Sequence, residues 1–347
     1  METVDRASAM ARLIAWLRWP LAMAIVGYMF WQHREGFARI AGQSLMWNWV
    51  VAAIVFRAVA IGVASTRWWM LVRAQEIPFA LRDALRLGLC GNACNYVVPG
   101  TVGGDLTKVV LIARDHPNVK ATVAVTVVLD RILGLMALLL VGASASLLHS
   151  QLWSHPQLST GMVLLTVGSL GGVTALCLML HPVFVTSRLW QWMSGLPRVG
   201  GVVTELARGV GLYQQRRAAV VGGLLLSMLG HICSITACFC CAVALRLTDL
   251  APEFITHALI VPIAEVAASV LPLPGGIGAR EGAMQCLYST VSASGASAGE
   301  AGFYVAVGFS LVSIVVAAIG AGVALLLTRR RDSAAVRTGV RTAAATV

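Results

Sequence analysis

The chain has 347 residues, of which 58% are hydrophobic and only 12% charged, and its formal net charge is +11. A soluble domain carries about 25% charged and roughly 45–50% apolar residues, so this composition excludes a water-soluble globular protein. Most of the Lys and Arg residues lie in short loops and at the termini, and no basic stretch interleaved with aromatic residues indicates a nucleic-acid surface.

Apolar runs of about 20 residues, long enough to cross a hydrocarbon layer of roughly 30 Å, recur along the chain. The first run follows Arg6, Arg12 and Arg18 and has no small-residue cleavage site after it, so we expect a retained span rather than a signal peptide. We predict an all-α polytopic membrane protein with about six full transmembrane helices. Their expected positions are 14–32, 47–66, 121–148, 161–181, 218–241 and 303–328.

Segments 67–88 and 187–217 mix apolar and basic residues, which predicts amphipathic helices on the cytoplasmic face. With the N-terminus inside, the arginine-rich loops fall inside, and the loop at 149–160, which has no Lys or Arg, falls outside. This distribution indicates a multi-pass protein of a bacterial cytoplasmic (inner) membrane with both termini in the cytoplasm. We expect one transmembrane domain over residues 1–328 and a basic disordered tail over 329–347.

Two apolar stretches, 90–108 and 266–281, are interrupted at their centres by Pro and Gly residues, which break or distort helices. Irregular backbone at membrane depth is tolerated only where it is buried in protein or lines a wet cavity. We therefore predict two re-entrant helical hairpins, at about 80–114 and 254–295. The expected tip residues are Pro99, Gly103, Gly104, Pro272, Pro274, Gly275, Gly276 and Gly278.

The two tips resemble each other in sequence. Pro99 is followed four and five residues later by Gly103 and Gly104, and Pro272 is followed three and four residues later by Gly275 and Gly276. Interrupted segments at corresponding positions in two halves indicate a binding site between inverted repeats. The alternative is that both are packing kinks, because Gly and Pro are common in membrane helices.

Charged residues inside the predicted spans need a reason, because a charge at the bilayer centre costs at least about 2.5–3.5 kcal/mol. Arg57 lies in the middle of one span, either as a cation facing a cavity or as a residue that snorkels or pairs. Asp130 and Arg131 are adjacent in another span and point about 100° apart, so each is expected to find a partner on another helix. Arg57 with Asp130 is one candidate pair.

The first hairpin places Asp105 and Lys108 at the start of a helix, after a pair of glycines. Asp105 can cap that helix, or the exposed N–H groups and Lys108 can form an anion site. Asn92 and Asn95 add neutral hydrogen-bonding groups on the approach to the tip.

The second hairpin carries Arg280 and Glu281, and Glu265 lies earlier in the same segment. Arginine suits bidentate contact with phosphate. Glu281 can bind a proton or anchor Arg280, and Glu265 can carry a proton or serve as a satisfied structural acid. His231 is expected to be a packed, hydrogen-bonded residue.

Motifs of hydrolytic, nucleotide-binding and metal chemistry are missing from the sequence, which has no HExxH, P-loop, GxSxG or dinucleotide fingerprint. Four of the eight cysteines lie in the span 218–241, where cysteine behaves as a small hydrophobe. Cys90 and Cys94 have no second pair at zinc-finger spacing. We expect no metal and no cofactor.

Three motifs occur in order along the chain, and together they resemble the hallmarks of the lysylphosphatidylglycerol synthase/flippase transmembrane-domain family. They read Asn95-x3-Pro99-Gly100-x2-Gly103-Gly104-Asp105-x2-Lys108, then Asp130-Arg131-x2-Gly134-Leu135, then Pro272-x-Pro274-Gly275-Gly276-x-Gly278-x-Arg280-Glu281. The resemblance covers roughly residues 10–330. It implies a flippase-like protein with two re-entrant hairpins that moves modified phospholipids or polyprenyl-linked lipids between leaflets. The site residues it implies are Asn95, Asp105, Lys108, Asp130, Arg131, Arg280 and Glu281.

The best-known members continue into a soluble aminoacyl-transferase domain, whereas the last predicted span here ends at Thr328. We therefore expect a non-enzymatic translocator that moves a lipid made elsewhere. Its expected partners are membrane lipids with an anionic or phosphate headgroup, a lipid-synthesis enzyme and a second copy of the chain. The alternatives are a membrane-embedded transferase acting on a lipid phosphate, with Glu265 or Glu281 as its base, and a non-transporting partner subunit of a lipid-synthesis complex.

Overall fold

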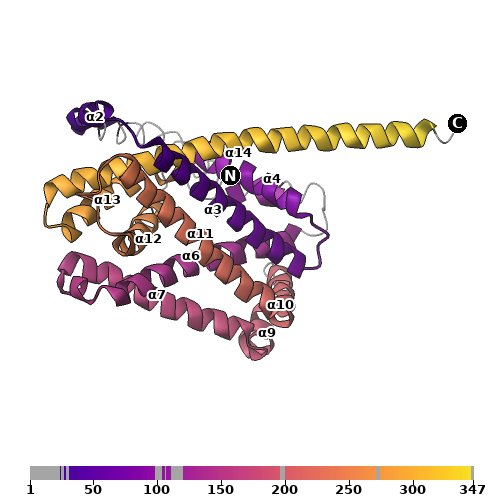
Figure 1. The fold of residues 1–347 in the computed structure, drawn as a ribbon. Helices are drawn as coiled ribbons and strands as arrows, with labels where there is room; N and C mark the ends of the chain where they lie inside the picture. Colours follow the sequence, from indigo (N-terminus) through magenta and orange to yellow (C-terminus); the bar gives the residue numbers. More distant parts are fainter. Residues whose placement is uncertain are drawn as a thin grey trace, which may run out of the picture.

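The computed structural model describes residues 24, 27, 28, 31–97, 104, 105, 107–110, 120–195, 200–270 and 274–344, and every regular element within them is helical (Figure 1). Five helices are long and apolar enough to cross a membrane, which makes the chain a multi-pass membrane protein. They are α3 (Trp47–Ala74), α6 (Lys120–Leu148), α7 (Pro156–Leu180), α11 (Arg217–Ala244) and α14 (Ala296–Ala344).

These five helices confirm five of the six predicted spans, and the first, 14–32, lies almost wholly outside the described residues. The prediction for 67–88 was wrong in its first third, because α3 continues to Ala74. Arg67 is 8% exposed and faces other helices rather than the membrane surface. A buried partner on another helix is the reason, and it is described with the site below.

Short helices replace the predicted amphipathic segment 187–217. They are α9 (Arg188–Ser194) and α10 (Gly200–Gln215), preceded by α8 (Val183–Thr186). The Tyr213 hydroxyl of α10 donates to the Leu71 carbonyl at 3.0 Å, which attaches α10 to the end of α3. Burial raises the pKa of Tyr213, so this hydroxyl keeps its proton and remains a donor at neutral pH.

The prediction of a disordered tail was also wrong, because α14 continues through Ala344. Residues 329–344 are rich in Ala and Arg, two of the best helix formers, and nothing before Gly339 interrupts the helix that the apolar span begins. The remaining elements are α2 (Arg34–Ala41) and η2 (Ser150–Ser154).

The two interrupted stretches are each a helix, a break and a second helix. The first consists of α4 (Leu81–Val97) and a helical stretch within 104–110. The second consists of α12 (Phe254–Val270), the short η3 (Pro274–Gly276) and α13 (Ala279–Val291). Of the predicted tip residues, Pro99, Gly103 and Pro272 lie outside the described residues.

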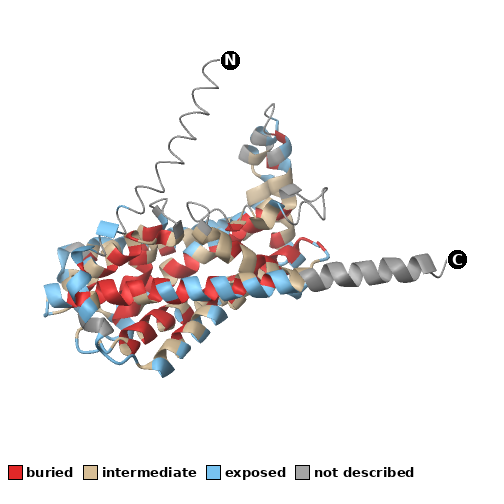
Figure 2. Cartoon of the chain, turned by 90° about the horizontal axis from the view of Figure 1, so that it is seen from above, coloured by how far each residue is buried: buried red, intermediate tan, exposed pale blue. Residues whose placement is uncertain are grey.

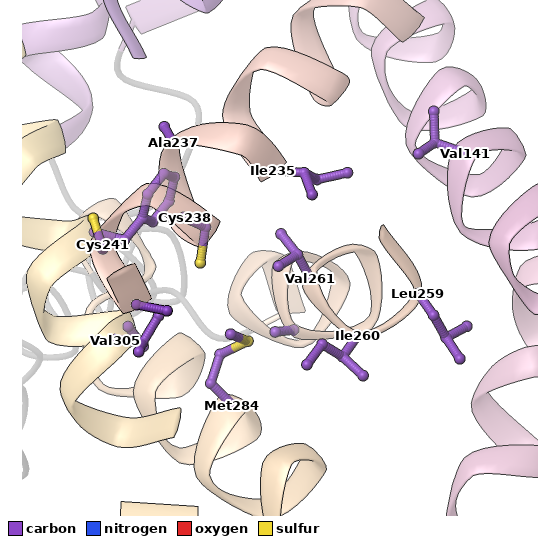
Figure 3. Packing of buried hydrophobic residues seen from close by; sticks show 14 of the residues in the cluster. Val141, Ile235, Ala237, Cys238, Cys241, Leu259, Ile260, Val261, Met284 and Val305 are labelled. Atoms are coloured by element: carbon purple, nitrogen blue, oxygen red, sulfur yellow. The ribbon is translucent and has the colours of Figure 1, made fainter. Parts of the chain in front are cut away.

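Small and medium apolar side chains pack the interior around α11 and α12 (Figure 3). Ile235 and Cys238 of α11 face Val261 of α12, with Met284 of α13 and Val305 of α14 on the other side. The buried residues lie inside the helix bundle and the exposed ones on its outer faces (Figure 2). Many of these exposed residues are large and apolar, as expected for helices that face lipid.

Candidate functional site

A cavity of about 520 Å³ lies between the long helices and the two interrupted segments. Its walls come from α3, α4, α6, α11, α12 and the helical residues after the first break. Eight of the ten predicted site residues line it: Arg57, Asn92, Asn95, Asp105, Lys108, Asp130, Arg131 and Glu265. Arg280 and Glu281 do not line it and lie behind Glu265.

The cavity lies at mid-height of the long helices. Arg57 is ten residues after the start of α3, Asp130 is ten residues after the start of α6, and Ser234 is ten residues before the end of α11. At 1.5 Å per residue each lies about 15 Å from a helix end. Arg67, ten residues after Arg57 on α3, also lines the cavity, so the cavity extends about 15 Å along this helix. It therefore brings polar groups together well inside helices that are long enough to cross a membrane.

Arg67 and Asp130 form a buried ion pair between α3 and α6. Arg67 Nε donates to Asp130 Oδ1 at 2.7 Å, and its Nη1 donates to Ser227 Oγ of α11 at 2.6 Å. The expected pairing of Arg57 with Asp130 was therefore wrong. The physical reason is that Arg67 reaches the carboxylate while also satisfying a hydroxyl, so three helices meet at one guanidinium.

Lys108 lies between two carboxylates, 3.7 Å from Asp105 and 3.9 Å from Asp130. Its ammonium also lies 4.9 Å from the centre of the Trp68 ring. Arg131 donates to the other oxygen of Asp105. Asp130 and Arg131 thus find partners away from each other, as their adjacency on a helix predicts. Asp105 takes part in ion pairs, a role that sequence reasoning did not assign to it.

A second charged group lies behind α12. Arg280 donates to both oxygens of Glu265, at 2.7 and 3.2 Å, to Ser310 Oγ at 3.1 Å and to the Gly275 carbonyl at 3.2 Å. Through these bonds the Arg280 guanidinium holds the Glu265 side chain at the cavity wall and fixes the backbone of the second break at Gly275. Arg280 is therefore a positioning residue in this structure.

Glu281 caps the start of α13. Its carboxylate accepts from the Gly278 backbone N–H at 2.5 Å and from Ser310 Oγ at 2.5 Å. Glu281 does not anchor Arg280 directly, and both residues meet at the same serine hydroxyl. A carboxylate at a helix N-terminus satisfies donors that the helix cannot.

Arg57 differs from the other cations of the cavity. Its Nη1 donates to Ser234 Oγ at 3.2 Å, and its guanidinium lies 5.3 Å from the centre of the Phe309 ring. No carboxylate of the described residues lies within 4 Å of it, and its buried Nε has no protein acceptor. Arg57 therefore forms no ion pair at the cavity wall, and its charge interacts with that of the Glu265 carboxylate.

The two helical arms of the first interrupted segment contact each other closely. A Cβ at Gly91 would lie 3.0 Å from the carbonyl oxygen of Gly104, so the backbones meet where only glycine fits. Asn95 Oδ1 accepts from the Gly104 N–H at 2.9 Å. Asn95 therefore fastens the arms together, whereas the buried Nδ2 of Asn92 has no protein acceptor.

The second break needs glycine for its backbone geometry. Gly275, Gly276 and Gly278 have φ angles of 61°, 72° and 93°, which L side chains rarely adopt. A Cβ on Gly275 would also lie 2.5 Å from Cε1 of Tyr96, at the end of α4. The second break therefore lies against the end of α4.

Three of the polar lining residues, Arg67, Ser227 and Ser234, were not among the predicted site residues. Arg67 was assigned to an interfacial helix, and Ser227 and Ser234 gave no signal beyond being polar in an apolar span. His231 lines the cavity and bonds to the Gly134 carbonyl at 2.9 Å, which confirms the expected packed histidine. The described residues contain no group of three or more His, Cys, Asp or Glu that could hold a metal ion.

Apolar side chains such as Ile61, Leu138 and Leu226 share the cavity wall with the charged ones. The site can accept a ligand that is polar at one end and apolar at the other. A family model described as the lysylphosphatidylglycerol synthase TM region matches residues 9–321. The chain matches no curated protein and no solved structure.

Proposed function

The chain belongs to the family of the lysylphosphatidylglycerol synthase transmembrane region, and from this premise we propose that it moves a phosphate-bearing lipid between membrane leaflets. The observation that carries the proposal is the mid-height cavity with charged and apolar walls. A lipid headgroup that crosses the bilayer needs polar partners at this depth, because hydrocarbon offers none. The acyl chains can stay beside the apolar walls while the headgroup passes.

The two interrupted segments are proposed to be re-entrant hairpins. Helices α12 and α13 have 17 and 13 residues, fewer than the roughly 20 that a straight crossing needs. The first helix of such a pair can therefore reach the middle of the membrane from one side, and the second can return to the same side. The contact between Gly275 and Tyr96 supports an inverted-repeat arrangement in which the two hairpin tips meet at the substrate path.

We further propose a bacterial cytoplasmic membrane location with both termini inside, in accord with the loop charges. The acids of the cavity are held in ion pairs, which favours a role in binding over a role as a free base. Asp130 and Glu265 each accept a guanidinium bond at 2.7 Å. A translocator that leaves its lipid chemically unchanged fits this arrangement better than a transferase.

The test is leaflet-resolved movement of fluorescent lipids in proteoliposomes that contain the full chain. The lipid panel spans zwitterionic, anionic, aminoacylated and polyprenyl-phosphate headgroups. We expect selective movement by the wild type and its loss in Arg131→Ala, because Arg131 is a half-exposed cation of the cavity. Arg208→Ala is the matched control, since Arg208 is an exposed arginine of α10 outside the cavity.

Mass spectrometry of the recovered lipids separates transport from chemistry. Unchanged lipid masses with movement support the translocator. A changed headgroup mass would favour the transferase instead. No movement of any lipid by folded wild-type protein would refute the proposed function.

A further inference from the structure

The cavity carries one unit of excess positive charge. With histidine counted as neutral, its described lining holds four cations and three carboxylates. These residues are Arg57, Arg67, Lys108 and Arg131, and Asp105, Asp130 and Glu265. Behind the lining, Arg280 and Glu281 cancel each other. A buried site with uncompensated charge is unfavourable until a ligand of opposite sign enters.

The lining cations fall into two groups: Arg67, Lys108 and Arg131 share the carboxylates of Asp105 and Asp130, whereas Arg57 forms no ion pair. Each of the other three cations lies within 4 Å of a carboxylate. The contacts of Arg57 are the Ser234 hydroxyl and the Phe309 ring, and its charge also interacts with that of Glu265, which is bonded to Arg280. Anion binding at Arg57 therefore requires no ion pair of the protein to break, whereas binding at any other lining cation does.

A second buried hydrogen-bond donor without a partner, the side-chain amide of Asn92, lies near Arg57. Four buried side-chain polar atoms of the described residues have no partner, and the two that line the cavity, Arg57 Nε and Asn92 Nδ2, are both N–H donors. Ser65 of α3 packs against Gly88 of α4, and the short connection at 75–80 makes these helices antiparallel. Residues 61 and 57 of α3 are then level with 92 and 96 of α4. Asn92 is thus about one turn from the level of Arg57, within reach of its long side chain.

We propose that Arg57 and Asn92 form the headgroup subsite and donate to the oxygens of a phosphodiester, and that the cavity selects a headgroup with a net charge of −1. This inference rests on the proposed function and names its substrate class. Guanidinium N–H groups match phosphate oxygens in geometry and charge. A headgroup with a charge of −1 neutralises the net positive charge of the cavity lining. A zwitterionic headgroup leaves that charge unchanged, and an aminoacylated headgroup with a net positive charge increases it.

The experiment measures equilibrium binding of short-chain phosphatidylglycerol to the purified full chain in detergent. Phosphatidylethanolamine and lysyl-phosphatidylglycerol of the same chain length supply net charges of zero and +1. Glycerophosphoglycerol, the headgroup without acyl chains, distinguishes a lipid from a water-soluble phosphodiester. Lipid movement in proteoliposomes is measured in parallel.

We expect wild-type protein to bind phosphatidylglycerol more tightly than the other three compounds. Arg57→Gln should weaken this binding by about 10- to 100-fold, the loss expected for a hydrogen bond to a charged group. Asn92→Asp should also weaken it, because the new carboxylate neutralises Arg57. Ser313→Ala is the matched control, because Ser313 Oγ is another buried orphan atom but lies outside the cavity. If Arg57→Gln does not fold, Arg57→Lys and Asn92→Asp carry the test.

Wild-type affinity in folded Arg57→Gln, or in both Arg57→Lys and Asn92→Asp, would overturn the subsite. Binding of lysyl-phosphatidylglycerol at least as tight as that of phosphatidylglycerol would overturn the charge selection. Binding of glycerophosphoglycerol as tight as that of the lipid would assign the site to a soluble ligand and overturn the lipid. Selective, Arg57-dependent binding without lipid movement would support the subsite and refute the proposed translocation.

Discussion

Removal of either partner of the Arg67–Asp130 pair should strongly destabilise the protein. Both side chains are at most 10% exposed, and the joining bond is 2.7 Å long. Asp130→Ala leaves the buried Arg67 guanidinium without a carboxylate, at a cost of about 3–5 kcal/mol of unfolding free energy, and Arg67→Met leaves Asp130 with only Lys108, 3.9 Å away. Asp130→Ala should cost more than Arg67→Met, because it also removes a carboxylate 3.9 Å from Lys108.

The double variant Arg67→Met/Asp130→Ala separates the pair from its surroundings. With both charges gone, its loss should be smaller than the sum of the two single losses by about 0.5–3 kcal/mol. Asp130→Asn keeps an acceptor oxygen without the charge, so it should cost about 1.5–3 kcal/mol. The measurement is reversible unfolding in mixed micelles of increasing denaturing-detergent content.

Additive losses, within about 0.5 kcal/mol, would refute the reasoning, because independent sites add and coupled ones do not. Wild-type stability in both single variants would refute it as well. Arg208→Met is the matched control, because Arg208 is 72% exposed and its pair with Glu205 is a surface one. We expect it to change the unfolding free energy by less than about 0.5 kcal/mol.

Three further substitutions can be checked by thermal unfolding in detergent. Gly275→Ala should cost at least about 1–2 kcal/mol, because φ is 61° and the new Cβ would lie 2.5 Å from Cε1 of Tyr96. Glu281→Gln should cost about 1.5–3 kcal/mol, because its neutral amide offers one acceptor oxygen where the carboxylate accepts two bonds of 2.5 Å. Tyr288→Phe should cost about 1–3 kcal/mol, because it leaves the buried ring nitrogen of His257 without its partner at 2.5 Å.

Gly282→Ala is the control for Gly275→Ala, since nothing lies within 4 Å of its added Cβ and its helix tolerates alanine. Equal stability of the two alanine variants would contradict the argument from backbone geometry. An unchanged unfolding temperature in Tyr288→Phe or Glu281→Gln would show that the corresponding bond contributes little. Gel filtration of each variant confirms that folded protein is compared.

Sequence reasoning located the long spans because they depend on local hydrophobicity, which a short window of residues reveals. The start of α3 at Trp47 and the end of α6 at Leu148 coincide with the predictions. The two breaks were also visible, since Pro and Gly change the backbone wherever they occur. Their glycines do adopt positive φ angles in the second segment.

Partner choice among charged residues could not be predicted in this way. Arg67 and Asp130 are 63 residues apart, and the packing of α3 on α6 brings them together. A run of arginines suggested that α3 ends near residue 66, because an unpaired arginine belongs at the membrane surface. Because the buried carboxylate of Asp130 pairs with Arg67, this arginine can lie inside the membrane span. The sequence does not show this pairing, which depends on how the helices pack.

The contact between Gly91 and Gly104 has a mechanical consequence. Backbones that touch, fastened by the Asn95 bond, leave no side-chain layer that could slide or shear. The two arms cannot move apart without breaking that bond. We therefore expect them to move together as one rigid unit, with the turn before α4, where Glu76 has a φ of 64°, as the hinge.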